Sequence, residues 1–160
     1  MTAEIERDFP RLAESGYRVT SPASRDYNCL AWAAGDNRSW WWPGSHGYWP
    51  VKAPREETMR AFLAAYRQIG FEPCADASYE PGIEKIAVYG DSSGRPTHTA
   101  RQLPSGAWTS KLGKTEEIEH QTLKGLTGAW YGGVKRILRR PVPLLRRPSG
   151  IDGVRPDRGG

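Results

Sequence analysis

Hydrophobic residues in the first half of the chain recur at helical spacing. The clearest case predicts an amphipathic helix over about 55–68, ended by Gly70. The apolar face of this predicted helix carries Met59, Phe62, Leu63, Tyr66 and Ile69. A second, shorter helix is expected over about 5–16, with Gly16 at its end.

A short apolar run, 30–34, begins directly after Cys29 and stops at Gly35. This pattern predicts a buried helix with Cys29 in its first turn and either Asp26 or Asn28 as the N-cap. Free backbone N–H groups and the positive end of the helix dipole stabilise a thiolate at such a position. The residue type and its place therefore make Cys29 a candidate nucleophile.

The second half of the chain changes to the alternation of strands. The predicted strands cover about 71–74, 84–89, 97–103 and 107–111. A helix is expected over about 115–126 with Thr115 as its N-cap, and 130–138 reads equally as strand or helix. Helices followed by a small antiparallel sheet define an α+β fold.

The 160 residues suffice for one domain, expected over 1–138, followed by a flexible tail over 139–160 rich in Arg, Pro and Gly. From Arg139 onward the chain holds six arginines and two aspartates, or +4, against +5 for the whole chain. The body is therefore nearly neutral. Because no aromatic residues are interleaved with the tail arginines, a specific nucleic-acid partner is not expected.

The mean hydropathy of −0.67 and the lack of a long apolar run predict a protein that does not enter a membrane. The acidic, polar first residues do not resemble a secretory signal, so a cytoplasmic location, or export by a signal-less route, is expected. The only cysteines are Cys29 and Cys74, which fit a reduced compartment and a free thiol better than a disulfide. The oligomeric state stays open.

A histidine far along the chain completes the candidate chemistry. His98 opens the predicted strand 97–103, and one cysteine at a helix start with one such histidine is the minimal set for thiol catalysis. His46 lies in a glycine-flanked loop, and His120 is assigned to the surface or packing of the expected helix. The three histidines and Cys74 include no closely spaced ligand pair, so neither a metal nor a cofactor is expected.

The order of these motifs resembles the papain-like cysteine peptidases of the NlpC type. The resemblance rests on the segment 27–33 (YNCLAWA), on 98–102 (HTARQ) and on 106–113 (GAWTSKLG), and covers about 27–113. It implies a bacterial peptidase or amidase in which a cysteine helix packs on a small antiparallel sheet. The family's cell-wall enzymes carry Asp before the cysteine and a small residue after it, whereas Asn28 and Leu30 stand here.

The family also uses a third polar residue on the strand after the histidine. If Leu103 pairs with Ala107, Ser110 shares the face of His98, and we select it as the third catalytic residue. A shift of one residue would present Thr109 and Lys111 instead.

The expected reaction is acyl transfer to Cys29 with His98 as general base. The backbone N–H of Cys29, with the side chain of Asn28 or Tyr27, is expected to stabilise the oxyanion. The tryptophan-rich loop 39–50 is interpreted either as a lid on the cysteine helix or as a ligand wall. The expected substrate-binding side chains are Trp41, Trp42, Trp49 and Gln102.

The expected function is hydrolysis of an amide bond in a peptide or cell-wall fragment. One rival is a deamidase or transglutaminase-like acyltransferase that acts on protein glutamine through the same dyad. The other is a non-enzymatic module that binds glycan or peptide through Trp40–Trp49.

Overall fold

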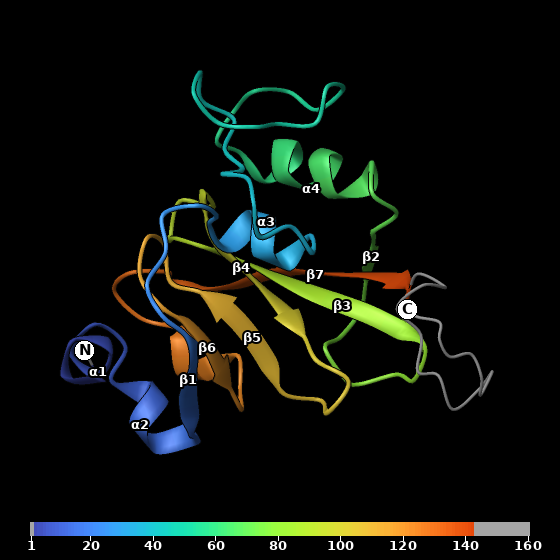
Figure 1. Ribbon diagram of the computed structural model, residues 1–160. Helices are drawn as coiled ribbons and strands as arrows, with labels where there is room; N and C mark the ends of the chain where they lie inside the picture. Colours follow the sequence, from blue (N-terminus) through green and yellow to red (C-terminus); the bar gives the residue numbers. More distant parts are fainter. Residues whose placement is uncertain (1, 143–160) are drawn as a thin grey trace, which may run out of the picture.

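One seven-stranded antiparallel sheet organises the chain (Figure 1). The computed structural model describes residues 2–142. The strands, in sheet order, are β1 (Tyr17–Ser21), β6 (Glu117–His120), β5 (Trp108–Lys111), β4 (Pro96–Gln102), β3 (Ile83–Gly90), β7 (Gly133–Pro141) and β2 (Glu72–Cys74). The helices are α1 (Thr2–Asp8), α2 (Arg11–Ser15), α3 (Cys29–Ala33), α4 (Met59–Arg67) and the 3₁₀ turn η1 (Lys124–Leu126). The α+β class expected from the sequence is confirmed.

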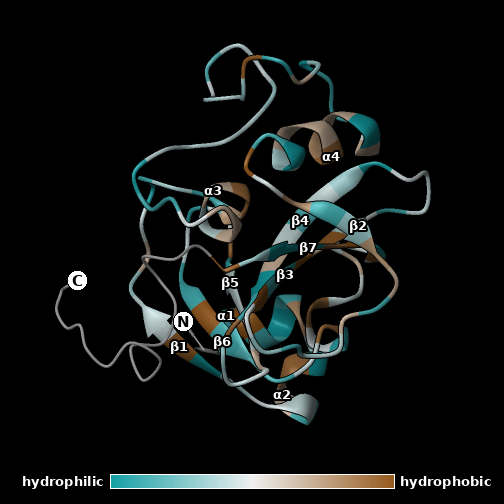
Figure 2. Ribbon diagram, turned by 90° about the vertical axis from the view of Figure 1, so that its right-hand side faces the viewer, coloured by the Kyte–Doolittle hydropathy of each residue, from teal (hydrophilic) through white to brown (hydrophobic). Residues whose placement is uncertain are grey.

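The helices lie on both faces of the sheet. Figures 1 and 2 show α3 and α4 on one face, and α1 and α2 below the other, near β1 and β6. Each face has its own core. The α3-side core includes Leu30, Phe62, Tyr66, Ile86 and Val88. The α1-side core includes Phe9, Leu12, Tyr89, Ala100 and Ile118.

The first predicted helix is divided in two. Pro10 separates α1 from α2 because its ring restricts the backbone and removes an N–H donor. Gly16 ends α2 with φ of 99°, a left-handed conformation that glycine adopts without strain. The expected end of the helix at Gly16 is thus confirmed, while its continuity over 5–16 is wrong.

The second predicted helix begins later than expected. Thr58 caps α4 by accepting a hydrogen bond from Ala61 N at 3.1 Å, so residues 55–57 precede the helix. Its apolar face packs as predicted, with Phe62 and Tyr66 fully buried.

The helix predicted over 115–126 is wrong. Thr115 N instead bonds Leu112 O at 2.9 Å and closes a turn between β5 and β6. Residues 117–120 then pair on both sides, with β5 and with β1. Ladder hydrogen bonds to two neighbouring strands override the local preference of Glu116 and Glu117 for a helix.

The segment that the sequence left open, 130–138, lies largely in a strand. β7 runs from Gly133 to Pro141 between β3 and β2. The domain therefore continues past residue 138, and the boundary expected there is wrong, because Arg139 and Arg140 belong to the sheet. Residues 143–160 of the expected tail lie outside the described residues.

No helix within residues 2–142 is long and apolar enough to span a bilayer.

Candidate functional site

The N-terminus of α3 is fixed by one side chain. Asn28 Oδ1 accepts hydrogen bonds from Ala31 N at 3.2 Å and from Trp41 N at 3.1 Å, while Nδ2 donates to Trp41 O at 2.7 Å. Asn28 is therefore the N-cap, and it also clamps the tryptophan-rich loop onto α3. One of the two Nδ2 hydrogens is thus committed to Trp41 O, and the expected oxyanion role of Asn28 stays a prediction.

Cys29 is the first residue of α3, as expected, and its side chain is 8% exposed. Burial raises the pKa of its thiol to about 11, since a thiolate is poorly solvated there. The backbone N–H groups of Thr99, Leu30 and Cys29 itself, with the charge of Lys111, act in the opposite direction but are outweighed. The resting side chain is thus a neutral thiol beside β4.

His98 lies in a buried chain of hydrogen bonds with Ser110 and His120. Ser110 Oγ is 2.9 Å from His98 Nε2 and 2.9 Å from His120 Nε2. His120 Nδ1 is in turn 2.9 Å from the carbonyl oxygen of Thr122. The contact between His98 and Ser110 that the strand register predicted is confirmed, because Leu103 N bonds Ala107 O at 2.7 Å.

The direction of these hydrogen bonds assigns the protons. Burial lowers the pKa of His120 to about 4 and that of His98 well below 6.5, so both rings are neutral. The carbonyl of Thr122 only accepts, so His120 Nδ1 carries the proton and its Nε2 accepts from the Ser110 hydroxyl. Ser110 Oγ then accepts from His98 Nε2–H. His98 Nδ1 is left as an unprotonated nitrogen.

This nitrogen has no hydrogen-bond partner although it is buried. The His98 ring stacks on Tyr131 at 4.1 Å between centroids and meets Tyr89 edge-on at 5.3 Å. A buried basic nitrogen without a donor is costly and uncommon in folded proteins. His98 Nδ1 is such a nitrogen within the described residues.

Cys29 and His98 do not form the expected hydrogen bond. Side chains alternate along β4, so Thr99 and Arg101 face α3 while His98 pairs with Tyr89 on the opposite face. Within the described chain, His98 Nδ1 receives no hydrogen bond, from Cys29 or any other group. The expectation of a preformed thiol–imidazole contact is therefore wrong.

β4 and β5 form ladder pairs at Arg101↔Thr109 and Gln102↔Trp108, and beyond these pairs the hydrogen bond between His98 and Ser110 still joins the two strands. Tyr131 stacks on His98, and charge on Cys29 contributes, after burial, to the raised pKa of the Tyr131 phenol.

Thr109 and Lys111, the alternatives to Ser110, lie on the α3 face. Thr109 Oγ1 accepts from Trp32 Nε1 at 3.0 Å, and Lys111 Nζ donates to Ser24 O at 2.7 Å and to Gly113 O at 2.6 Å. Neither of them reaches His98.

The proposed oxyanion and substrate residues serve other contacts. Tyr27 donates its only hydroxyl hydrogen to Glu117 Oε2 at 2.7 Å, so it lacks a free donor. Trp41 and Trp49 are 5% and 3% exposed, and Trp42 meets Phe62 edge-on at 5.8 Å. The loop therefore packs as a cover over α3 and α4, which favours the lid interpretation over an open ligand wall.

Gln102 lies away from Cys29. Its Nε2 donates to Ala77 O at 3.0 Å, while its buried Oε1 has no partner. It lines a hollow of about 310 Å³ at the open ends of β3 and β4, next to Tyr79 and Leu103. Cys29 lines neither this hollow nor the one beside Tyr131.

Two residues of the site were missed from the sequence. His120 is predicted in a helix, whereas it lies in β6 between two other strands. The alternation of apolar and polar side chains before it is the sequence signal that indicates a strand. Tyr131 lies in the segment left open, and no local pattern links it to His98. Within residues 2–142, no three side chains of His, Cys, Asp or Glu are grouped as a metal site.

The chain belongs to a family whose function has not been assigned. Residues 18–139 match the family described as "Domain of unknown function (DUF7689)", which spans α3 and all of the His98 network. The search of the curated proteins found no match. The search of the solved structures found none either.

Proposed function

We propose that this domain is a papain-like cysteine hydrolase in which Cys29 is the nucleophile and His98 the general base. The observation that carries the proposal is the bare Nδ1 of His98, held in that state by the Ser110–His120 chain. A purely structural histidine would be expected to satisfy both ring nitrogens. Here one nitrogen is fixed by its hydrogen bond to Ser110, and within the described residues the other has no partner.

The chemistry follows the division of roles between the two nitrogens. His98 Nδ1 takes the Cys29 proton as sulfur attacks the carbonyl carbon of an amide, and the same proton then goes to the leaving amine. Water attacks the resulting thioester and gives one proton to Nδ1; the C–S bond then breaks, the acid leaves, and Nδ1 returns that proton to the sulfur to restore the thiol. Ser110 keeps Nε2–H in place throughout, so it is a positioning residue.

The raised pKa of Cys29 fits this sequence of steps. A thiol with a pKa of about 11 does not ionise in advance at neutral pH. Its proton must therefore leave during the attack, which requires a neutral base brought to the sulfur. His98 is unprotonated throughout the neutral range because burial lowers its pKa.

The proposal includes one movement. Because Cys29 and His98 lie on opposite faces of the sheet, β4 and β5 must separate beside Thr99 for the sulfur to reach Nδ1, and the cover formed by loop 39–50 must admit the acyl group. Within the described residues, β4 and β5 share the two ladder pairs Arg101↔Thr109 and Gln102↔Trp108.

An ester substrate tests the proposal without knowledge of the natural one. With p-nitrophenyl acetate, we expect a burst of nitrophenolate, an acetyl adduct on Cys29 and slow turnover. Cys29→Ser should abolish all three, and Cys74→Ser should change none of them. His98→Gln retains a donor for Ser110 and should slow acylation by at least about tenfold, as for loss of a general base.

Acetylation of Cys74 alone, or an unchanged rate in folded His98→Gln, would overturn the assignment. Loss of amide nitrogen from a glutamine peptide, without chain cleavage, would instead identify the deamidase.

A further inference from the structure

A hollow of about 310 Å³ lies where β3 begins and β4 ends. The ladder between these strands covers Ile86↔Arg101 to Gly90↔Pro96, so the hollow lies at the end of the ladder and beyond it. Neither Cys29 nor His98 lines it. The hollow is therefore separate from the proposed active site.

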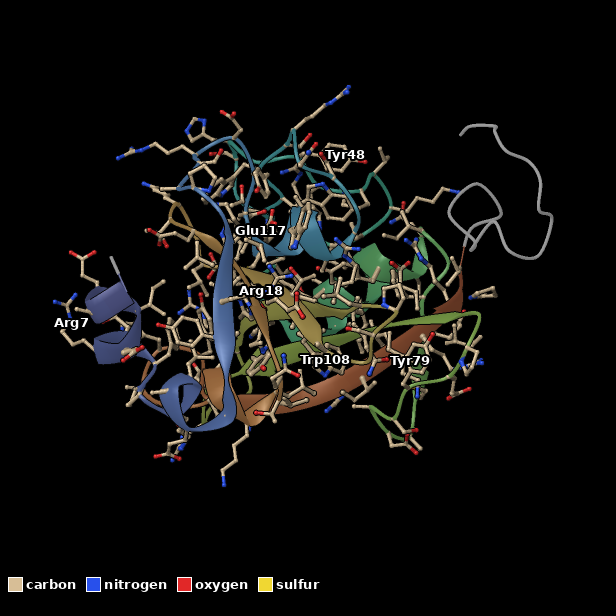
Figure 3. All side chains as sticks on the ribbon, turned by 60° about the horizontal axis from the view of Figure 1, so that its bottom comes forward. Arg7, Arg18, Tyr48, Tyr79, Trp108 and Glu117 are labelled. Carbon is tan, nitrogen blue, oxygen red and sulfur yellow. The ribbon has the colours of Figure 1, made fainter. Side chains whose placement is uncertain are left out.

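The wall of the hollow is mainly apolar. Tyr79, on the segment that leads into β3 (Figure 3), is 43% exposed and stands at the rim. The other apolar side chains of the wall are those of Ile83, Leu103, Pro104 and Val142. An apolar wall with a few placed polar groups is typical of small-molecule sites, so the hollow suits a ligand with an apolar body.

The charged side chains of the wall are already engaged. Glu84 Oε1 accepts from Arg140 Nε at 2.9 Å, and Glu84 Oε2 is 3.9 Å from Arg101 Nη1. Arg101 also donates from Nε to Trp32 O at 3.2 Å, and its guanidinium lies over the Trp32 ring at 4.7 Å. The one carboxylate and the one guanidinium that line the hollow thus compensate each other, which favours a neutral ligand.

Gln102 is the specific polar feature of this wall. The residue is 7% exposed, and its Nε2 donates to Ala77 O at 3.0 Å and to Gly106 O at 3.5 Å. Because both carbonyls only accept, turning the amide over would place Oε1 against two acceptors. Oε1 is therefore fixed as an acceptor, and within residues 2–142 no donor reaches it. A ligand N–H or O–H would recover the free energy that such a buried, unpartnered oxygen costs.

The unpartnered oxygen and the apolar hollow belong to one place in the fold. In the part of the chain that the structure describes, the other buried side-chain atoms without a partner are on His98 and Thr99, which do not line this hollow. Two independent observations thus point to a ligand: an apolar space, and an acceptor in its wall that lacks a donor.

We propose that this hollow binds a small neutral aromatic ligand that donates one N–H or O–H hydrogen bond to Gln102 Oε1. The ligand ring would pack on Tyr79 in the offset or edge-on geometry that aromatic pairs prefer. Because Oε1 is shielded from solvent, the wall must open slightly as the ligand enters. The inference does not depend on the hydrolase proposal.

Titration of the full chain with indole, with benzofuran as the matched probe, tests the site. The two molecules have nearly the same shape, but benzofuran carries an oxygen where indole carries its N–H donor. The readout is the ¹⁵N spectrum, followed at the backbone amides of Gly82 and Leu103 and at the side-chain amide of Gln102. We expect both probes to shift these resonances and indole to bind about fivefold more tightly, as for one neutral hydrogen bond.

Variants separate the hydrogen bond from the apolar contact. Gln102→Met keeps a side chain of similar length without the acceptor and should make the two dissociation constants equal. Tyr79→Ala should weaken both probes several-fold and keep their ratio, whereas the exposed control Tyr48→Ala should change neither. If Gln102→Met does not fold, the ratio in the parent chain and the effect of Tyr79→Ala decide.

Equal affinity of the parent chain for indole and benzofuran would overturn the proposal, as would the absence of shifts around the hollow up to the solubility limit of the probes. Benzoate or benzylammonium bound as tightly as indole would contradict a neutral site. Cys29→Ser should bind indole as tightly as the parent chain, because the thiol does not line the hollow.

Discussion

At the scale of single residues, the chain of hydrogen bonds from His98 to Thr122 is what distinguishes this protein from an ordinary α+β domain. Each group in the chain fixes the next, so that one carbonyl oxygen determines which nitrogen of His98 is basic. The arrangement requires both imidazole rings to stay neutral. Because low pH favours the protonated rings, the free energy of unfolding depends on pH.

The free energy of unfolding should fall as the pH falls below 6.5. Burial lowers the pKa of His120 to about 4 and that of His98 well below 6.5, while both are near 6.5 in the unfolded chain. Between 6.5 and about 4 the unfolded chain therefore binds protons that the folded chain does not, which destabilises the fold. Above pH 6.5 this loss is absent.

Urea denaturation at several pH values between 7 and 5 measures this slope. The exposed His46 serves as the control, because His46→Gln should leave the slope unchanged whereas His120→Gln should make it shallower. A free energy of unfolding that is constant over this range would contradict neutral, buried rings.

How far the sequence predicts this site depends on the residue. Ser110 was found by counting the register across a three-residue turn, because side-chain alternation carries information over such short distances. His120 and Tyr131 were not found, since they join the site through pairing and stacking between distant segments. The face of His98 relative to Cys29 was also missed, because the sequence does not show which side of the sheet a helix will cover.

At the scale of elements, the short helix α3 is held mainly by its cap and its neighbours. Five residues form too few internal hydrogen bonds for a stable helix. The sequence identified α3 correctly, because N-cap, apolar run and closing glycine all agreed. The same reasoning failed for β6, where Thr115 looks like an N-cap but two flanking strands determine the structure.

Asn28→Ala should destabilise the fold by about 2–3 kcal/mol, because it removes the cap and both bonds to Trp41. Thr58→Ala removes only the cap of α4 and should cost about 1 kcal/mol. Chemical denaturation gives both values, and iodoacetamide labelling reports on the loop.

Because the loop covers α3, Asn28→Ala should also speed alkylation of Cys29 while Thr58→Ala should not. Equal effects of the two substitutions on stability and labelling would show that Asn28 is a simple cap.

At the scale of the whole molecule, the sheet separates two cores, and its last strand contributes side chains to both. β7 pairs with β3 along its length and contributes Arg140, whose guanidinium bonds Glu84 Oε1 at 2.9 Å and Ile69 O at 2.7 Å. The Arg-rich composition that suggested a tail at 139 thus includes a structural arginine. Composition alone does not separate a buried Arg from a solvated one.

Truncation tests where the domain ends. A chain ending at Val142 should be more stable than one ending at Leu138, because it retains every strand described within residues 2–142. A chain ending at Leu138 loses the ion pair of Arg140 with buried Glu84 and the ladder pairs of residues 139–141, which should cost about 3–5 kcal/mol. Equal melting temperatures of the two truncated chains would contradict the assignment of 139–141 to the sheet.

The most direct test of the central claim is the rate at which chloroacetamide alkylates Cys29 at neutral pH, measured by mass spectrometry with Cys74 as the internal reference. If His98 accepts the thiol proton, His98→Gln will lower the Cys29 rate by at least about tenfold and leave the Cys74 rate unchanged. If both cysteines react in the folded variant as they do in the parent chain, Cys29 and His98 do not form a catalytic pair.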